Sequence, residues 1–401
     1  MILIFTTHPI QYQTPLWKKI AESKIDIEVI FLTKHGLELS YDAEFGTSFK
    51  WNLNLLDGYS YSFAKVNENA DVNSFYNLRL KQSLKSIIAD RHVEAIWIQG
   101  WQALAYWQIA IQARILNIPI WLRGETNNLK PKYFSKEIVK YLPFKLFFGS
   151  ISKFLYIGKA NRNFYLERGI SQENLIFAPY CIDVDRFQEK LIKAPETKIS
   201  ARKKWNIPED SFCFIFSGKF IEKKMPMIIL EASKKIPHHK IHLLFVGDGE
   251  LRNNLIKSAN VAYAPDHFAI EDRDAITQSV SVSFTGFINQ DEISDAYIAS
   301  DCLLLPSDYG ETWGLVVNEA YAHGIPAIVS DHCGCYPDLV EPFHQPLIFE
   351  YNNVSDLSRA MLFALENHKN LTSHLTQVNS TYNYDTTVKN ISNLLNSTPT
   401  I

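Results

Sequence analysis

The chain has 401 residues, of which 46% are hydrophobic and 21% charged, and its formal net charge is −3. This composition is typical of a globular protein, and the length exceeds one ordinary core, so we expect two domains of about 200 residues each. The small net charge argues against general nucleic-acid binding. No apolar run reaches the ~20 residues of a membrane span, and the start, Met1-Ile-Leu-Ile-Phe5, lacks the basic region of a signal peptide. We therefore expect a cytoplasmic protein; association with the inner face of the membrane stays open.

The first half alternates short apolar runs, which predict strands, with longer periodic stretches, which predict helices. Residues 36–75 have weak periodicity and predict an irregular region or a small hairpin. Such alternation is typical of a doubly wound parallel sheet. The predicted strands are 2–5, 27–32, 95–98, 119–122, 154–157 and 175–177, and the predicted helices are 10–23, 74–89 and 104–116.

A second alternating series begins after residue 210, behind a charged stretch at 188–204 that is typical of a linker. Residues 259–279 form a polar insertion within it. The predicted strands are 212–216, 242–246, 282–285, 302–305 and 327–329, and the predicted helices are 227–235, 248–258, 291–300, 314–323, 355–366 and 381–395.

The most informative stretch is 301–331, where a strand, a loop, a helix and a second strand follow each other. The ligand site of such a unit lies beyond the carboxyl end of the first strand, and the N–H groups at the helix start suit an anion. Gly310, Glu311, Thr312, Trp313 and Gly314 occupy that loop, followed by Leu315.

Glu319 follows Glu311 in the same stretch, with seven residues between the two. Ionised carboxylates accept hydrogen bonds strongly from hydroxyl groups, so a sugar explains a carboxylate beside an anion site. The alternative is structural, with Glu311 as a helix cap and Glu319 in solvent. The stretch closely resembles the Glu-x7-Glu motif of family-4 glycosyltransferases, which have the GT-B fold, use nucleotide-sugar donors and retain the anomeric configuration.

The resemblance implies an α/β chain of GT-B architecture, with two Rossmann-like doubly wound parallel-sheet domains facing across a cleft. Residues 1–190 are then the acceptor-side domain, 205–375 bind the nucleotide sugar, and the C-terminal helix at 379–401 packs back on the first domain. At the end of the first domain, Tyr180 and Cys181 replace the Asn-Gly that is usual in the family.

On the donor side, Lys219 and Lys224 match positions where the family has an Arg and a Lys. Cations there would stabilise the negative charge that grows on the departing diphosphate. Lysines near helix starts are also commonly just solvated. The resemblance further assigns Glu311 to the sugar and Glu319 to the ribose. It also places at the donor Gly218, Gly247 and Phe287. Gly247, with Gly249, would let backbone come close to the ligand. Phe287 stacks on the base or belongs to the core.

On the acceptor side, the first loop contains His8 but no glycine, although family members often have a glycine-rich loop there. A later strand, where the family often has a His, ends in Arg123-Gly-Glu125. We name His8, Arg123 and Glu125 as candidates; a structural Arg123–Glu125 ion pair is the alternative.

We expect no metal and no cofactor. The five cysteines are odd in number and lack metal-ligand spacing, so reduced thiols are expected. Asp183-Val-Asp185 imitates the Asp-x-Asp metal motif of the other large glycosyltransferase fold, but its place before the charged stretch favours a structural role.

Residues 130–153 interleave lysines with aromatic residues. A basic face with aromatic anchors suits a helix lying on anionic lipid, as in a peripheral membrane protein. The alternative is that the aromatic side chains belong to the domain core and the lysines to solvent.

The resemblance therefore predicts a retaining, metal-independent glycosyltransferase. It would move a hexose or N-acetylhexosamine from a UDP- or GDP-linked donor to a glycan or lipid-linked acceptor, in cell-surface polysaccharide or glycolipid synthesis. The alternative is a nucleotide-sugar-binding protein or a same-fold epimerase without glycosyl transfer.

Overall fold

The computed structural model describes residues 1–37, 40–42, 47–49, 54–130, 142–193, 197–236, 240–268, 280–290 and 292–397. The chain divides into two compact units, one made of Met1–Ser40, Leu53–Tyr180 and Asn383–Ile401, the other of Tyr41–Asn52 and Cys181–Tyr382. The first unit therefore ends at Tyr180 rather than at residue 190, because α6 (Val184–Lys193) packs on helices of the second unit.

The first unit is built on a seven-stranded parallel sheet of order β5-β2-β1-β6-β7-β8-β9. From β1 the chain goes to β2 on one side, whereas β6 flanks β1 on the other, so the topological switch point lies between β1 and β6. The strands are β1 (Ile2–Thr6), β2 (Ile27–Phe31), β5 (Ser60–Phe63), β6 (Ala95–Ile98), β7 (Ile120–Leu122), β8 (Lys153–Tyr156) and β9 (Leu175–Phe177).

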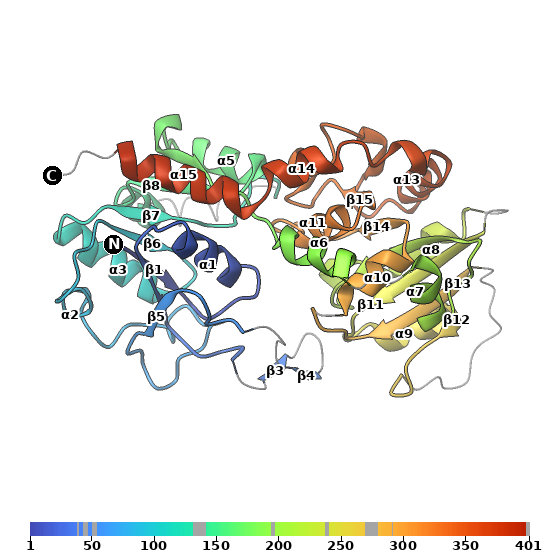
Figure 1. Cartoon of the computed structure of the whole chain (residues 1–401), viewed down its shortest axis with the longest axis horizontal. Coiled ribbons are helices and arrows are strands. Elements are labelled where there is room, and N and C mark those ends of the chain that lie inside the picture. Colours follow the sequence, from blue (N-terminus) through green and yellow to red (C-terminus); the bar gives the residue numbers. More distant parts are fainter. Residues whose placement is uncertain are drawn as a thin grey trace. The chain divides into compact units, whose positions relative to one another are not determined.

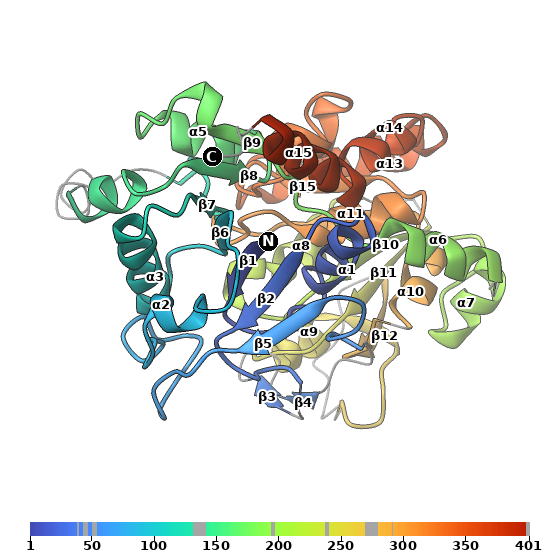
Figure 2. The same ribbon diagram turned by 60° about the vertical axis from the view of Figure 1, so that its left-hand side comes forward.

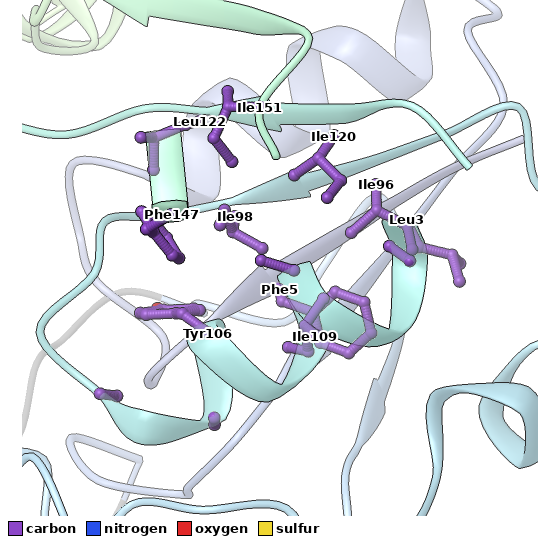
Figure 3. Packing of buried hydrophobic residues seen from close by; sticks show 14 of the residues in the cluster. Leu3, Phe5, Ile96, Ile98, Tyr106, Ile109, Ile120, Leu122, Phe147 and Ile151 are labelled. Carbon is purple, nitrogen blue, oxygen red and sulfur yellow. The ribbon is translucent and has the colours of Figure 1, made fainter. Parts of the chain in front are cut away.

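Alternating side chains of these strands build a core on each face of the sheet. Figure 3 shows Phe5 and Ile98 packed against Tyr106 and Ile109 of α3 (Leu104–Ile115). On the other face, Trp17 of α1 (Thr14–Glu22) meets Trp97 edge to face, with ring centroids 5.1 Å apart.

The C-terminal helix α15 (Tyr384–Ser397) belongs to this first unit (Figures 1 and 2). Tyr384 Oη donates to Tyr12 O at 3.0 Å, and Asn390 Nδ2 donates to Phe177 O at 2.7 Å. The C-terminal helix thus packs against α1 and β9 of the first unit.

The predicted helix at 74–89 is wrong; only α2 (Leu84–Ile87) is helical there. Leu78 and Leu80 are buried, and the Leu80 and Leu84 N–H groups donate to the side chains of Gln108 and Gln112, each at 2.8 Å. Side chains of α3 thus take the donors that a helix would use internally. The first unit also contains α5 (Lys159–Leu166) and the short 3-10 helix η1 (Gln172–Asn174).

The second unit has a seven-stranded parallel sheet of order β12-β13-β11-β10-β14-β15-β16. The chain goes from β10 to β11 on one side and returns to β14 on the other, so the switch point lies between β10 and β14. The strands are β10 (Phe212–Ser217), β11 (Ile241–Val246), β12 (Asn260–Tyr263), β13 (Ser281–Gly286), β14 (Cys302–Leu305), β15 (Ala327–Ser330) and β16 (Ile348–Phe349). The separate pair β3 (Ser40–Asp42) and β4 (Thr47–Phe49) completes the strands.

The helices of the second unit fall into two packed groups. In one, α8 (Pro226–Ser233) contacts α9 (Arg252–Ser258) and α13 (Val354–Asn367). In the other, α6 and α7 (Lys198–Lys204) contact α10 (Ile293–Ala299), and α6 and α14 (Leu375–Thr381) contact α11 (Leu315–Ala322). The short elements are α12 (Tyr336–Leu339), η2 (Glu222–Lys224), η3 (Gln345–Leu347) and η4 (His368–Asn370).

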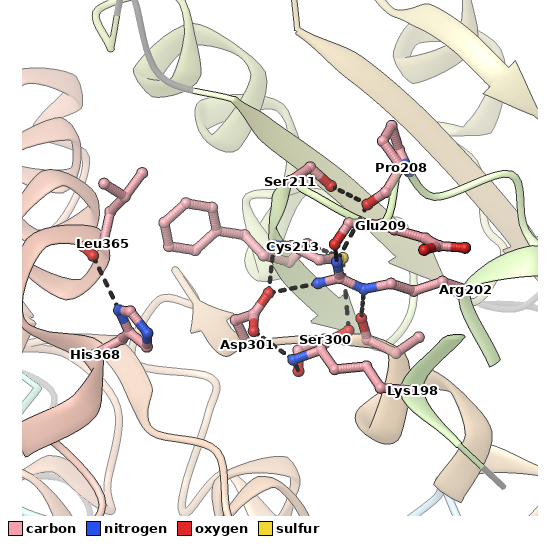
Figure 4. A network of polar contacts seen from close by, with 12 residues as sticks. Lys198, Arg202, Pro208, Glu209, Ser211, Cys213, Ser300, Asp301, Leu365 and His368 are labelled. Atoms are coloured by element: carbon pink, nitrogen blue, oxygen red, sulfur yellow. Dashed lines mark hydrogen bonds and ion pairs between the residues drawn. The ribbon is translucent and has the colours of Figure 1, made fainter. Parts of the chain in front are cut away.

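The charged stretch at 188–204 is not a linker, because α6 and α7 occupy most of it. Arg202 is buried and donates to Asp301 Oδ2 at 2.7 Å and to Ala299 O at 3.0 Å (Figure 4). Asp301 also accepts from the backbone N–H of Cys213 at 2.8 Å and pairs with Lys198. Charges that look solvated in the sequence therefore fasten α7 to β10 and β14.

Candidate functional site

Three glycines close the strand ends beside the second unit's switch point. Gly218 N donates to Val246 O at 2.9 Å, and Gly247 N donates to Gly286 O at 3.0 Å, so the loops after β10, β11 and β13 are tied together. Gly247 has φ +131°, and a Cβ there would lie 2.0 Å from Gly218 O. The backbone of Gly247 therefore lies close to that of Gly218, and this contact joins two strand ends.

Lys224 and Glu311, both predicted site residues, meet in an ion pair. Lys224 Nζ donates to Glu311 Oε2, which also accepts from Ser307 Oγ at 3.3 Å. The side chains are 23% and 14% exposed, so the pair is accessible to a ligand. Asp308 N donates to Lys223 O at 2.9 Å and holds the two loops together.

The loop at 310–314 is only partly available as an anion cradle. Gly310 N donates to Asp308 Oδ1 at 2.6 Å, and Glu311 N donates to Asp308 O at 3.0 Å, so these two groups are used within the turn. Gly314 adopts φ +110°, and a Cβ there would lie 2.6 Å from Leu305 Cδ2. Thr312 lies two residues before this glycine, and α11 begins at Leu315 directly after it.

The Trp313 side chain belongs to the core. Its indole is 2% exposed, and Nε1 donates to Asn318 Oδ1 at 2.9 Å. The ring also lies against Tyr382, with centroids 5.7 Å apart. Trp313 thus fixes the start of α11 from inside.

Glu319 is buried rather than solvated, with 1% exposure. Tyr297 Oη donates to Glu319 Oε2 at 2.7 Å, and Gln290 Nε2 donates to Oε1 at 3.5 Å. Arg186 Nη2 donates to Gln290 Oε1 at 2.7 Å, which turns the Gln290 amide N–H groups toward the carboxylate. The His323 ring stacks on Tyr297 with centroids 4.9 Å apart.

Lys219 and Phe287 follow Gly218 and Gly286 at strand ends of the same sheet, and both are half-buried. Sequence reasoning missed Asp248, which is buried, accepts from Gly249 N at 2.7 Å and pairs with Arg252 at 2.9 Å. It also missed Tyr297, since nothing local marks a tyrosine that reaches the next helix.

The predicted first-unit residues lie at the carboxyl ends of β1 and β7. His8 shares a hydrogen bond with Thr7 Oγ1 at 2.9 Å, and burial, aided by His35, lowers its pKa to about 4. Arg123 and Glu125 do not form the suggested ion pair: Arg123 Nη2 donates to Ala178 O at 3.2 Å and to Pro179 O at 2.9 Å.

Glu125 lies instead beside the Tyr180 hydroxyl. Burial, and next the Glu125 carboxylate, raise the pKa of Tyr180 well above its ordinary value. Arg123 flanks the same ring, with Cζ 5.3 Å from its centroid. Tyr180, which replaces the family's usual Asn, is thus part of this polar cluster.

Asp183 Oδ1 accepts from Arg186 N at 3.2 Å at the start of α6, which is the structural role that its place in the sequence favoured. Within the described ranges, no group of three or more His, Cys, Asp or Glu side chains is arranged to hold a metal ion. All five cysteines lie in the described part of the chain, are buried, and take part in no disulfide bond.

Of the basic, aromatic stretch at 130–153, residues 131–141 lie outside the described part. Phe147 and Phe148 are buried and pack on Trp107 and Trp101, with centroids 4.4 and 5.5 Å apart. These aromatic side chains belong to the core, whereas Leu142 and Leu146 are exposed. Of the helices that can be described, none is long and apolar enough to cross a bilayer.

Comparison with known proteins places residues 197–378 in the family model described as glycosyl transferases group 1, which supports a glycosyltransferase family. The sulfoquinovosyl transferase SQD2 of Arabidopsis thaliana is 31% identical over 157 residues, 37% of this chain and 30% of that protein. The O-antigen biosynthesis glycosyltransferase WclY of Escherichia coli is 27% identical over 244 residues, 60% of each chain. The chain thus spans 30% to 60% of the lengths of these two relatives.

A solved structure, Anabaena Alr3699/HepE in complex with UDP, resembles this chain with a TM-score of 0.68 at 14% identity, over 99% of this chain and 100% of that one. The same protein in complex with UDP-glucose gives a TM-score of 0.66. The likeness shows a shared fold. Together with the two parallel sheets, it confirms the predicted GT-B architecture of two Rossmann-like domains.

Proposed function

We propose that this chain is a retaining glycosyltransferase that moves a hexose or N-acetylhexosamine from a nucleotide-diphosphate donor to a glycan or lipid-linked acceptor. The observation that carries the proposal is the Lys224–Glu311 pair at the second unit's switch point. A cation for phosphate and a carboxylate for hydroxyl groups lie side by side there, as a nucleotide sugar requires.

A donor that enters this site would replace the Lys224–Glu311 ion pair with its own contacts to each of the two side chains. Lys224, together with Lys219 at the neighbouring strand end, would neutralise the diphosphate, whose negative charge grows as the sugar departs. Glu311, released from Lys224, would accept from the sugar hydroxyls and stabilise the positive charge that develops at the anomeric carbon. Glu311 serves for electrostatics and orientation in this scheme, and departure and attack take place on the same face.

Glu319 would bind the ribose. Its carboxylate is held from within by Tyr297 and Gln290, which are neutral donors and leave its negative charge intact. An ionised carboxylate accepts two hydroxyl groups of a ribose with charge-assisted hydrogen bonds. Phe287 at the end of β13 is the candidate to stack on the base.

We propose a UDP- or GDP-linked donor and a role in cell-surface polysaccharide or glycolipid synthesis, at the cytoplasmic face of the membrane. The named role of WclY in O-antigen biosynthesis supports the proposed role in polysaccharide synthesis. The exposed Leu142 and Leu146 lie on the helical residues 142–148 and support peripheral membrane contact of that segment.

A panel of UDP-, GDP-, ADP- and CMP-sugars tests the proposal through the melting temperature of the purified chain. A ligand at 100 times its dissociation constant stabilises by about 2.7 kcal/mol. Lys224→Ala should abolish the shift, whereas Lys223→Ala, at the neighbouring exposed lysine, should keep it. Incubation of the best donor with candidate acceptors then separates transfer from binding without turnover; a stabilising donor that is never consumed would favour the binding protein.

Metal independence belongs to the same proposal, because the lysines are assigned the charge that a divalent cation would otherwise neutralise. Activity should persist in excess EDTA. Loss of activity with EDTA and recovery with Mn²⁺ would contradict the phosphate assignment.

A further inference from the structure

The first unit has a switch point of its own, and several buried polar side chains at the strand ends beside it have atoms without a hydrogen-bond partner among the described residues. Phe5, Ile98 and Leu122 are in register across β1, β6 and β7. The residues that follow them are Thr6, Gln99 and Arg123, and the ladder continues through Gln99 N to Phe5 O at 3.1 Å and Arg123 N to Ile98 O at 3.0 Å.

Because side chains alternate along a strand, these residues share the face opposite Ile98 and Leu122. Neighbouring strands lie about 4.8 Å apart, so Gln99 and Arg123 are direct neighbours. Gln11, from the loop after β1, is buried at the same strand ends, and Gln13 of that loop accepts from Thr6 Oγ1 at 3.2 Å.

Three polar atoms of this row are buried without a hydrogen-bond partner among the described residues: Gln99 Nε2, Arg123 Nε and Gln11 Oε1. Their side chains belong to residues that are 8%, 4% and 7% exposed. Buried polar atoms are nearly always bonded, and each one left unbonded costs about 1–3 kcal/mol. The set offers two donors and one acceptor to a molecule from outside.

The positive charge of Arg123 indicates that the ligand carries a negative charge. Its Nη2 donates to two backbone carbonyls, and its guanidinium flanks the Tyr180 ring, but none of the described acidic side chains forms an ion pair with it. A buried charge is ordinarily paired, because removal from water is otherwise too costly. An anion bound here would supply the missing partner.

We propose that this row is the subsite for an anionic group, a carboxylate or a phosphate, of the sugar acceptor. The anion accepts from Arg123 Nε–H and Gln99 Nε2–H, and an adjacent hydroxyl of the acceptor donates to Gln11 Oε1. That the ligand is the acceptor rests on the proposed function; the anionic chemistry rests on Arg123 alone. The donor diphosphate is the other source of the same chemistry.

Isothermal titration of the full-length chain with glucuronate, glucose 6-phosphate and glucose tests the subsite. At least one of the two anions should bind tenfold or more tightly than glucose, and Arg123→Gln should remove that difference. Arg114→Gln, at an exposed arginine of the same unit that donates to Gly149 O, should leave it in place. Equal affinity for all three sugars in the parent chain would overturn the proposal.

A titration with UDP separates the two sources of anion. Arg123→Gln should bind UDP as the parent does; a tenfold loss of UDP affinity would identify the donor diphosphate as the occupant and overturn the acceptor subsite. Should Arg123→Gln fail to fold by its melting curve, Gln99→Leu replaces it, and unchanged preference for the anion in that variant would likewise overturn the subsite. Failure of the parent chain to bind any nucleotide sugar would contradict the proposed function and not the anion site.

Discussion

At the scale of single residues, the two glutamates of the candidate donor site differ in what surrounds them. Glu311 is partly exposed and paired with the cation Lys224, whereas Glu319 is buried and bonded to the uncharged Tyr297 and Gln290. A carboxylate at the reacting sugar changes its interactions during the reaction, and one at the ribose hardly does. The two should therefore respond differently to the same substitution.

Glu311→Gln should act mainly on kcat, because the amide keeps the shape but loses the charge that stabilises the transition state. Glu319→Gln should mainly raise the donor KM. Loss of a charge-assisted hydrogen bond costs roughly 1.5–3 kcal/mol, or about tenfold to a hundredfold in each case. Donor kinetics of the purified variants, each with a melting curve, would measure both; parent-like kinetics in both folded variants would refute the site assignment.

Tyr297→Phe removes the hydroxyl that donates to Glu319 Oε2 and leaves the ring that stacks on His323. The carboxylate loses one of its orienting donors, so the donor KM should rise about tenfold while kcat changes little, given the 1.5–3 kcal/mol of a hydrogen bond to a charged group. Tyr321→Phe is the matched control, because the hydroxyl of Tyr321, on the same helix as Glu319, donates to Leu339 O of α12 and not to Glu319. An equal rise of the donor KM in both variants would mean that a general disturbance of α11, and not the lost hydrogen bond to Glu319, causes the effect.

At the scale of elements, the ends of β10 and β11 come together because Gly247, directly after β11, has no side chain. Any side chain at Gly247 would collide with the backbone of Gly218, where no rotamer change relieves the contact. Gly324, after α11, also has positive φ, +75°, but a Cβ there would meet nothing within 4 Å. A comparison of substitutions at Gly247 and Gly324 therefore separates the effect of a steric collision from that of backbone strain alone.

Gly324→Ala should cost about 1 kcal/mol, the ordinary penalty of a left-handed conformation for a residue with a Cβ. Gly247→Ala should cost clearly more and weaken donor binding, since the loops after β10 and β11 must move apart. Urea unfolding of both variants measures the difference. Equal stabilities would mean that the two strand ends adjust freely and that their close approach is not required.

At the scale of the whole molecule, buried histidines link stability to pH. His242 on β11 is fully buried and bonded to Ser283 Oγ at 2.9 Å, and burial lowers its pKa from 6.5 to about 4. Burial also lowers the pKa values of His8 and His374 to about 4. Between pH 6.5 and 4, the unfolded chain binds protons that the folded chain does not, so stability falls as the pH falls through this window.

For His242 the loss should reach about 3 kcal/mol by pH 4, at about 1.4 kcal/mol per pKa unit. His242→Gln should be less stable at pH 7 but should lose less stability on acidification than the parent. His92→Gln, at an exposed histidine, is the control. Denaturant unfolding at pH 7.0, 5.5 and 4.5 measures the slopes; parallel slopes for His242→Gln and the parent would show that folding does not lower the pKa of His242.

The sequence by itself determined the parts of this protein that depend on local order. Apolar runs buried on both faces of a sheet predicted most strands of both sheets, and the glycine, proline and turn pattern around α11 predicted the loop that carries Glu311. Local steric rules suffice for such features, as Gly314 with its positive φ illustrates. The resemblance also predicted that the C-terminal helix returns to the first unit, as α15 does.

Tertiary structure alone decided which polar groups meet. Gln108 and Gln112 took the backbone donors that a helix at 74–89 would have used, and Arg202 with Asp301 turned a linker-like stretch into packed helices. Partners distant along the chain likewise decided that Tyr297 holds Glu319, and that Arg123 faces carbonyl oxygens rather than Glu125. Side-chain hydrogen bonds depend on distances of a few tenths of an ångström between remote segments, and no local pattern of residue types encodes those distances.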